Sequence, residues 1–311
     1  MKESLRKFVS TFNNMRIEDY ISDRSRDIYH YTSPSGLASI IQNGTLRFTD
    51  RLFLNDKTEG IYVLHLCMEI LEEKNLHLNE DFRKSLSEML RAVTYDFSAY
   101  CLENKLNIYQ CSFSCDGDSL CLWNYYTKGD SIKGYNLHFE AKALCQGLKL
   151  NRIKTDGKPL RPLRGRVVYD KKKQTRIVTG VVQFFNELYK TSGIEISTLT
   201  KFLIDKLLFT GVFFKDSCFA IENEYRIVLP LYVNDDGTYM SLEDQPRHYE
   251  KNGILVPYID LEFPRECLLS IGLSPTVDDE MAVKSILRVG AKYENLRDRA
   301  NIVKSVIPVR Y

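Results

Sequence analysis

Apolar residues recur along the chain with two different periods, and these periods predict its strands and helices. Alternating positions and short runs rich in β-branched and aromatic residues are typical of strands. They predict strands over 28–31, 45–49, 108–114, 134–140, 166–169, 224–232, 254–261, 268–273 and 302–309. Apolar positions three and four residues apart predict helices over 59–73, 81–100, 119–126, 177–189, 194–209 and 282–289.

The segment from Ile28 to Arg47 has the sharpest pattern. Its short strand is followed by Ser33-Pro34-Ser35, a helix-start signal with proline near the first turn. Gly44 after Asn43 ends the helix, because glycine suits the left-handed cap. We therefore predict a strand, a short helix and a second strand, and we interpret this unit as the entrance to a functional site.

The whole set of elements predicts an α+β fold with mixed, mainly antiparallel sheets. We expect a single domain over 1–311, with its core over about 28–311 and helical insertions near 60–105 and 175–210. The sequence NDDG at 234–237 is a hairpin signal.

Composition narrows the class of protein. The chain of 311 residues is 44% apolar and has a net charge of +2, which is typical of a globular protein without a strong global field. An apolar leader and an apolar run long enough for a membrane span are missing, so we expect a cytoplasmic protein without membrane association. The eight cysteines are then reduced, and the strand-like spacing in CSFSC disfavours a zinc knuckle.

His30 is the first candidate for chemistry. It lies at a predicted strand end between Tyr29 and Tyr31, with the Thr32 hydroxyl beside it. Histidine can hydrogen-bond a ligand while tyrosine faces cover a flat ring. The alternative is a histidine that is simply satisfied in the core.

Asn55, Asp56 and Glu59 form a second candidate. A structural role is equally consistent with the pattern, with Asn55 or Asp56 as a helix cap and Glu59 as an acidic residue in the first turn. Two carboxylates alone do not select a cation, so a metal-dependent nuclease stays a minor alternative.

Aromatic and basic residues form a third candidate. Trp123, Tyr125 and Tyr126 could line a pocket that stacks a base or nicotinamide, or they could form an aromatic helix face packed on a sheet. The basic residues between 149 and 173 could follow a phosphate backbone, or they could be solvated. A non-catalytic module that binds a nucleotide or nucleic acid is therefore an alternative function.

Glu222 and Glu224 form the fourth candidate. Two apart in a predicted strand, they would face the same side, where Arg226 could neutralise one of them. One interpretation is a surface ladder of charges. The other is a carboxylate that opposes positive charge developing on a sugar carbon.

Taken in order, these motifs resemble an uncharacterised, mostly bacterial family with a domain of unknown function. The resemblance rests on FLNDKTEG, CSFS, LCLWNYY, ENEYRI and the opening YHYTSPSGLASIIQNGTLRFT, and it spans about 28–310. The family carries no activity with it.

The strand–His–helix–Gly opening also resembles the first motif of ADP-ribosyltransferases of the His-Tyr-Glu type. This resemblance implies an ADP-ribosyltransferase-like fold and an enzyme that uses NAD as substrate to modify nucleic acid or protein, or that hydrolyses NAD, in a bacterial defence or toxin system. It implies His30 as the ribose anchor, Tyr126 as the nicotinamide-stacking residue and Glu224 as the catalytic carboxylate. The expected cofactor-binding residues are Tyr31, Thr32, Arg47, Trp123, Tyr125 and Glu222. Tyr31 stands where many members have glycine.

Overall fold

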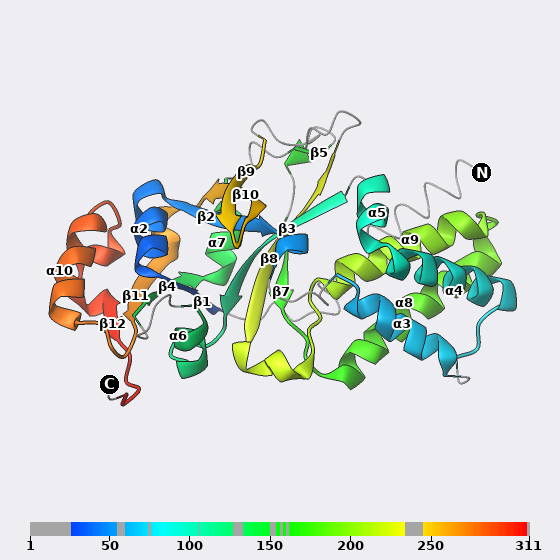
Figure 1. Ribbon diagram of the computed structural model, residues 1–311, viewed down its shortest axis with the longest axis horizontal. Helices are drawn as coiled ribbons and strands as arrows, with labels where there is room; N and C mark the ends of the chain where they lie inside the picture. The colour runs from blue at the N-terminus through cyan, green and yellow to red at the C-terminus, as the bar shows by residue number, and fades with distance from the viewer. Residues whose placement is uncertain are drawn as a thin grey trace. The chain divides into compact units, whose positions relative to one another are not determined.

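The computed structural model describes residues 26–54, 60–73, 76–104, 106–126, 133–149, 154–155, 158–159, 162–233 and 245–309 (Figure 1). These residues belong to two compact units. A helical unit takes its described residues from 54–107 and 167–220, which include both expected insertions. A sheet unit takes its described residues from 23–53, 108–166 and 221–311.

The opening unit follows the sequence prediction. Strand β1 (Asp27–Thr32) leads into helix α2 (Pro34–Asn43), which leads into strand β2 (Thr45–Asp50). The Ser33 hydroxyl accepts a hydrogen bond from the Gly36 N–H and caps the helix start. Gly44 ends the helix at φ 67°, a backbone conformation that side chains with a Cβ adopt at a cost.

The sheet unit is built on an open, mainly antiparallel sheet of ten strands, in the order β12-β11-β4-β1-β3-β2-β10-β9, with β8 pairing β3 and β7 pairing β8. The strands not yet introduced are β3 (Leu106–Ser114), β4 (Tyr135–Glu140), β7 (Leu163–Arg166), β8 (Glu224–Tyr232), β9 (Arg247–Lys251), β10 (Ile254–Glu262), β11 (Leu268–Leu273) and β12 (Ile302–Lys304). Strands β5 (Lys154–Thr155) and β6 (Lys158–Pro159) form a separate ladder. The chain is thus mixed α and β, as expected.

The sheet forks at β3. Ser114 pairs with Tyr29 of β1, and Gln110 pairs with Thr49 of β2. In an antiparallel ladder, residues an even number apart direct their backbone groups to the same edge, so β1 and β2 share one edge of β3. The Cys115 N–H bonds the Asn223 carbonyl, which places β8 on the other edge.

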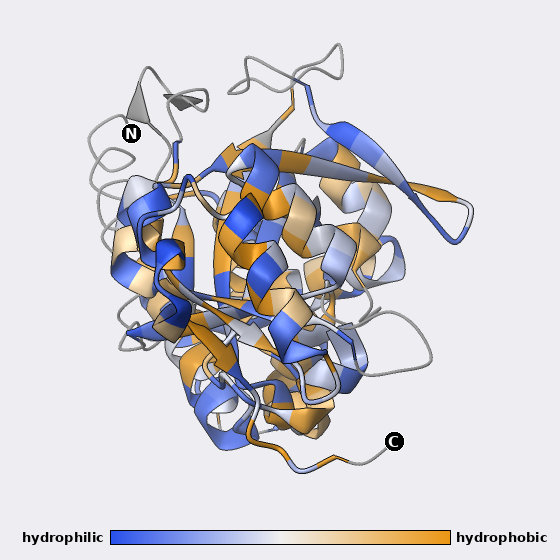
Figure 2. Ribbon diagram, turned by 90° about the vertical axis from the view of Figure 1, so that its left-hand side faces the viewer, coloured by the Kyte–Doolittle hydropathy of each residue, from blue (hydrophilic) through white to orange (hydrophobic). Residues whose placement is uncertain are grey.

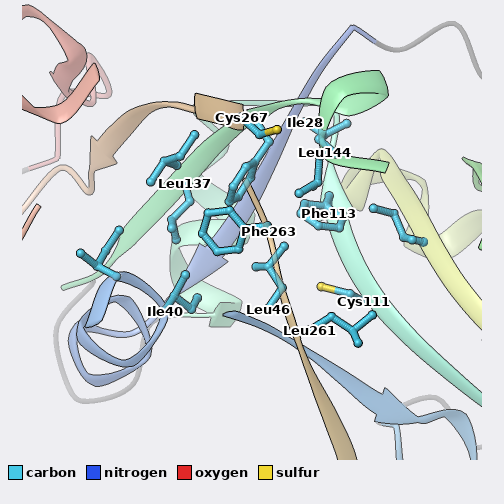
Figure 3. Packing of buried hydrophobic residues seen from close by; sticks show 14 of the residues in the cluster. Ile28, Ile40, Leu46, Cys111, Phe113, Leu137, Leu144, Leu261, Phe263 and Cys267 are labelled. Carbon is cyan, nitrogen blue, oxygen red and sulfur yellow. The ribbon is translucent and has the colours of Figure 1, made fainter. Parts of the chain in front are cut away.

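One face of this sheet is the hydrophobic core. Figure 3 shows side chains from β1, β3, β4, β2 and β10 pointing toward one another, with Ile40 of α2 and Leu144 of α7 (Ala141–Gly147) over them. The cluster also holds Ala282, Val283 and Ile286 of α10 (Asp279–Val289). Burial of this apolar face is the main favourable term in folding the sheet unit. In Figure 2 its helices carry both hydrophilic and hydrophobic residues, as amphipathic helices do.

The helical unit has its own core. Its helices are α3 (Tyr62–Glu72), α4 (Glu80–Tyr95), α5 (Phe97–Glu103), α8 (Lys171–Ser192) and α9 (Ile196–Gly211). Leu64, Phe82, Val181 and Leu203 are among the residues buried between them. Gly211 allows α9 to approach α3, because a Cβ there would lie 2.4 Å from a methyl carbon of Val63.

Several predicted boundaries were wrong. The expected helix over 81–100 is two helices, because the side chain of Asp96 caps a new helix by accepting from the Ala99 N–H. Helix α8 begins at Lys171, not Ile177, because Asp170 caps it there. The strand expected over 166–169 is β7, Leu163–Arg166, and the last strand ends at Lys304.

The hairpin of β9 and β10 was missed. Asn252 and Gly253 connect these strands with φ of 53° and 78°, as a tight hairpin turn of this kind requires. The sequence signal for this hairpin was the dipeptide Asn252-Gly253, which is typical of two-residue hairpin turns. The hairpin expected at NDDG lies outside the described residues. Within the described part of the chain, no helix combines the length and apolar character needed to cross a bilayer.

Candidate functional site

The face of the sheet opposite the main core carries polar residues beside a small apolar cluster of Tyr31, Leu122 and Trp123; we call it the polar face. In β1, Ile28 belongs to the core cluster, so His30 shares its side while Tyr29 and Tyr31 point to the other. In β3, Cys111 and Phe113 belong to the core. Side-chain alternation therefore places Gln110, Ser112 and Ser114 on the polar face together with the two tyrosines.

A row of polar residues crosses this face. Ser270 of β11 lies opposite His138 of β4, His138 opposite Tyr29 of β1, and Tyr29 opposite Ser114 of β3. The Tyr29 ring stacks on the His138 imidazole with centroids 4.6 Å apart. Burial, with Asp27 and Asp116 adding to it, raises the pKa of Tyr29. The row extends to the corner just before β8, where the Ser114 hydroxyl donates to the Glu222 carbonyl at 2.8 Å.

The corner before β8 is strained and held in place. Asn223 has φ 43°, which is uncommon for a residue with a Cβ. Its carbonyl accepts from the Cys115 N–H at 2.8 Å, and its Oδ1 accepts from Nη2 of Arg166 at 2.7 Å. Glu222 ends a 3-10 helix (Ser217–Glu222), so the strand alternation predicted for Glu222 and Glu224 does not apply. Strain maintained by surrounding bonds is common at functional sites.

Glu224 and Arg226 form a buried ion pair. Arg226 donates from Nε to Oε1 at 2.9 Å and from Nη2 to Oε2 at 2.7 Å. The Arg226 side chain is fully buried and that of Glu224 is 6% exposed, so the surface ladder interpretation was wrong. Successive residues of a strand point to opposite faces, and Tyr225 and Ile227 belong to the core. Glu224 and Arg226, which alternate with them, therefore lie on the polar face.

Gln110, a third buried polar residue of this face, has a side-chain oxygen without a hydrogen-bond donor. Gln110 is 3% exposed, and its Nε2 lies 3.5 Å from the Ser112 hydroxyl. Its Oε1 is buried without a hydrogen-bond partner. A buried acceptor of this kind costs free energy unless a donor reaches it.

Tyr31 and Trp123 are buried and pack against each other. The Tyr31 hydroxyl donates to the Asp116 carbonyl at 2.9 Å and accepts from the Ser119 N–H at 3.1 Å. The ring meets Trp123 of α6 (Leu120–Tyr126) edge-on at 4.6 Å. Trp123 is 1% exposed and donates to Asp118. Burial raises the pKa of Tyr31, so its hydroxyl stays protonated. These contacts fit the aromatic packing alternative for Trp123.

His30 lies at the fork. Its Nδ1 is 3.0 Å from the Ser112 carbonyl, so Nδ1 must carry the proton that is donated. Its ring also meets Phe113 edge-on at 5.5 Å. Burial lowers the pKa of His30, and the bond to Ser112 opposes that shift. The imidazole is therefore neutral at neutral pH, with Nε2 as an acceptor. His30 and Glu224 do not share a face of the sheet.

The remaining candidates lie at the ends of α6 and β1 and on β2. Tyr125 and Tyr126 end α6, with exposed fractions of 71% and 40%. Thr32 ends β1 opposite Tyr135. Arg47 lies on the other branch of the fork, where its guanidinium stacks 3.8 Å from the Tyr258 ring centre.

The second candidate from the sequence cannot be placed. Asn55, Asp56 and Glu59 lie outside the described residues. Over the described part of the chain, no group of three or more His, Cys, Asp or Glu side chains is arranged to hold a metal ion.

Comparisons with known proteins leave the site to be argued from its chemistry. Neither a family model, nor a curated protein, nor a solved structure matches the chain.

Sequence reasoning missed most of the polar row, although a signal was present. Because Ile28 is apolar, strand alternation already assigns His30 to its side and Tyr29 with Tyr31 to the other. His138 and Ser270 had no local signal, since they meet only through the pairing of β4 with β11.

Proposed function

We propose that the chain is an ADP-ribosyltransferase-like enzyme that cleaves the bond between nicotinamide and ribose in NAD. The observation that carries the proposal is the Glu224 carboxylate. It is fixed by Arg226 at the start of β8, beside the strand whose Ser114 faces Tyr29. Neighbouring strands lie about 5 Å apart, so the carboxylate and the Tyr29 strand are separated by about 10 Å, a span suited to a nucleoside.

The chemistry follows from the charge. Loss of nicotinamide leaves positive charge on the ribose carbon, and a fixed carboxylate in a water-poor site stabilises that charge. Arginine is always charged, so Arg226 gives Glu224 a counterion inside the protein and fixes its orientation. The buried Oε1 of Gln110 offers an acceptor for an amide N–H of the ligand.

The roles carried over from the resemblance change accordingly. Glu224 keeps the catalytic role. Tyr29, on the same face, replaces His30 as the β1 residue nearest the reacting sugar. His30 fixes the fork through Ser112, while its Nε2 remains an acceptor. Tyr126, at the end of α6, is the proposed nicotinamide-stacking residue. The proposed acceptor of ADP-ribose is a nucleic acid or a protein.

Release of nicotinamide tests the proposal. Purified protein incubated with NAD, alone and with nucleic acid or cell lysate, is expected to release nicotinamide, measured by chromatography. Glu224→Gln should lower the rate by at least about 100-fold, because removal of one group that stabilises transition-state charge typically costs 10²–10³. Glu280→Gln, an exposed carboxylate on α10, is the matched control and should keep the rate.

A second candidate has its own support. Arg226 occupies both oxygens of Glu224, an arrangement that also suits a non-catalytic nucleotide-binding module. Binding of NAD measured by calorimetry, unchanged in Glu224→Gln and without nicotinamide release under any condition, would replace the enzyme proposal with this one. Absence of both binding and turnover would remove both.

A further inference from the structure

Three polar side chains form a hydrogen-bonded line at the other end of the polar row. Oδ1 of Asp27 lies 2.8 Å from Nε2 of His138. Nδ1 of His138 lies 3.1 Å from the Ser270 hydroxyl. The residues come from β1, β4 and β11, which are adjacent in the sheet, so pairing of three distant segments brings them together.

The direction of these bonds fixes the state of the imidazole. An ionised carboxylate only accepts hydrogen bonds, so Nε2 of His138 carries a proton and donates it to Asp27. In the neutral ring Nδ1 is then the lone-pair nitrogen, and it accepts from the Ser270 hydroxyl. A serine hydroxyl aimed at an imidazole that a carboxylate orients is the arrangement of an activated nucleophile, here with the two ring nitrogens exchanged relative to the familiar triad.

Local structure holds the three side chains in register. The pairing of β11 with β4 shifts between Leu268 and Ser270, so Leu269 is skipped and Ser270 comes to lie opposite His138. The Leu268 carbonyl at this irregularity accepts from Nδ2 of Asn295 at 3.0 Å. Bulges that redirect one side chain are common beside active sites.

Stacking and access complete the arrangement. The Tyr29 ring covers one face of the His138 imidazole at an interplanar angle of 19°. Gly117 packs against the Tyr29 ring, since a Cβ at Gly117 would lie 2.7 Å from a carbon of that ring. The His138 side chain is still 19% exposed and that of Asp27 46%. Ser270 is half-buried, so a small reagent can reach the line from solvent.

We propose that Ser270 is a nucleophile toward small acyl and phosphonyl electrophiles, a second reactive centre that does not depend on Glu224. Ser270 Oγ bonds to the carbonyl carbon of an ester, and its proton passes to Nδ1 of His138, with Asp27 stabilising the imidazolium. The leaving alkoxide takes that proton and departs as the alcohol. Water then hydrolyses the Ser270 ester by the same proton path and releases the acid.

A fluorophosphonate ester tests the nucleophile directly. Attack by Ser270 expels fluoride, which leaves with the serine proton as HF, and the phosphonyl adduct stays on Oγ. Intact-mass measurement and peptide mapping are expected to find one adduct, on Ser270. Ser270→Ala should abolish it, while Ser39→Ala, an exposed serine on α2, should label like the wild type. A folded wild-type protein without an adduct on Ser270 would overturn the proposal.

The two supporting residues need readouts that separate chemistry from structure. His138→Gln should slow labelling at least about tenfold, since general-base assistance contributes 10²–10⁴. An unchanged rate in folded His138→Gln protein would overturn the role of His138. Asp27 is a positioning residue: nitrogen-15 NMR should find the His138 proton on Nε2 in the wild type and shifted toward Nδ1 in Asp27→Ala. Asp27→Glu should restore part of the Nε2 population and part of the labelling rate, and an unchanged tautomer in Asp27→Ala would exclude this role.

Discussion

The two faces of the sheet at β3 differ in kind. On the core face, Tyr109, Cys111 and Phe113 are buried in one continuous apolar cluster. On the opposite face, Gln110, Ser112 and Ser114 alternate with them along the same strand. Apolar burial explains the first face without reference to function. The second face buries groups that prefer water, so its composition needs another explanation.

The buried pair on β8 makes the contrast quantitative. Removing Glu224 and Arg226 from water costs several kcal/mol for each ion, and their attraction regains this only with good geometry. Apolar residues of similar volume often stabilise a protein equally well or better. The proposed role of Glu224 supplies a use for a pair kept on the polar face at such a cost.

The largest expected effect comes from breaking this pair on one side. Arg226→Met removes the Arg226 counterion from the buried Glu224 carboxylate and should cost roughly 3–5 kcal/mol of unfolding free energy. Urea unfolding followed by the fluorescence of Trp123, the single tryptophan and a buried residue of the sheet unit, measures it.

The double variant is the control for the pair. Arg226→Met with Glu224→Leu removes both charges and should recover most of the lost stability. If the double variant is as unstable as Arg226→Met alone, the lost packing around Arg226, and not the loss of its charge beside Glu224, is the cause.

Neighbouring residues of β4 compare the two faces directly. Leu137→Ala on the core face should cost roughly 2–5 kcal/mol, because it leaves a cavity in the cluster. Asn136→Ala on the polar face removes the bond from Nδ2 to the Gly117 carbonyl and should cost about 1 kcal/mol. The same fluorescence measurement applies, and equal losses would contradict the difference between the faces.

Local signals in the sequence predicted most elements of the fold. The Ser33 cap, the Gly44 end and the strand over 224–232 depend on neighbouring residues, and the structure agrees with all three. Two of the wrong helix boundaries involve a cap, at Asp96 or Asp170, that competes with a longer apolar period. A side-chain cap acts over three residues, so averaging over a whole helical period hides it.

The candidate site was harder, because its geometry is not local. Glu224 and Arg226 could be singled out from spacing, but their burial depends on strands distant in sequence. His30 was singled out for the chemistry of its side chain. It is two residues from Ile28 in the same strand, however, so strand alternation places it on the core side. The line from Asp27 to Ser270 spans more than two hundred residues of chain and could not be anticipated.

The last prediction concerns an exception on the core face. Asp50 follows Leu46 and Phe48 in alternation and lies opposite Tyr109, so a carboxyl group ends this apolar row. It is 3% exposed, and burial raises its pKa to about 6 despite the Leu52 N–H that it accepts. Unfolded aspartate titrates near 3.9, so between these values only the folded protein holds the proton. The contribution of Asp50 to stability is therefore fully present below about pH 4 and is lost as pH rises to about 6, by at most about 3 kcal/mol.

Asp50→Asn isolates this effect, since the amide oxygen can still accept from Leu52 and has no proton to lose. The difference in unfolding free energy between wild type and variant should change between pH 4 and 6 and stay constant above about pH 7. His30 acts in the opposite direction: burial lowers its pKa, so its protonation destabilises the protein as pH falls. That contribution is common to both proteins and cancels in the difference. A flat difference would mean that Asp50 titrates normally, and that the core face ends where water already reaches it.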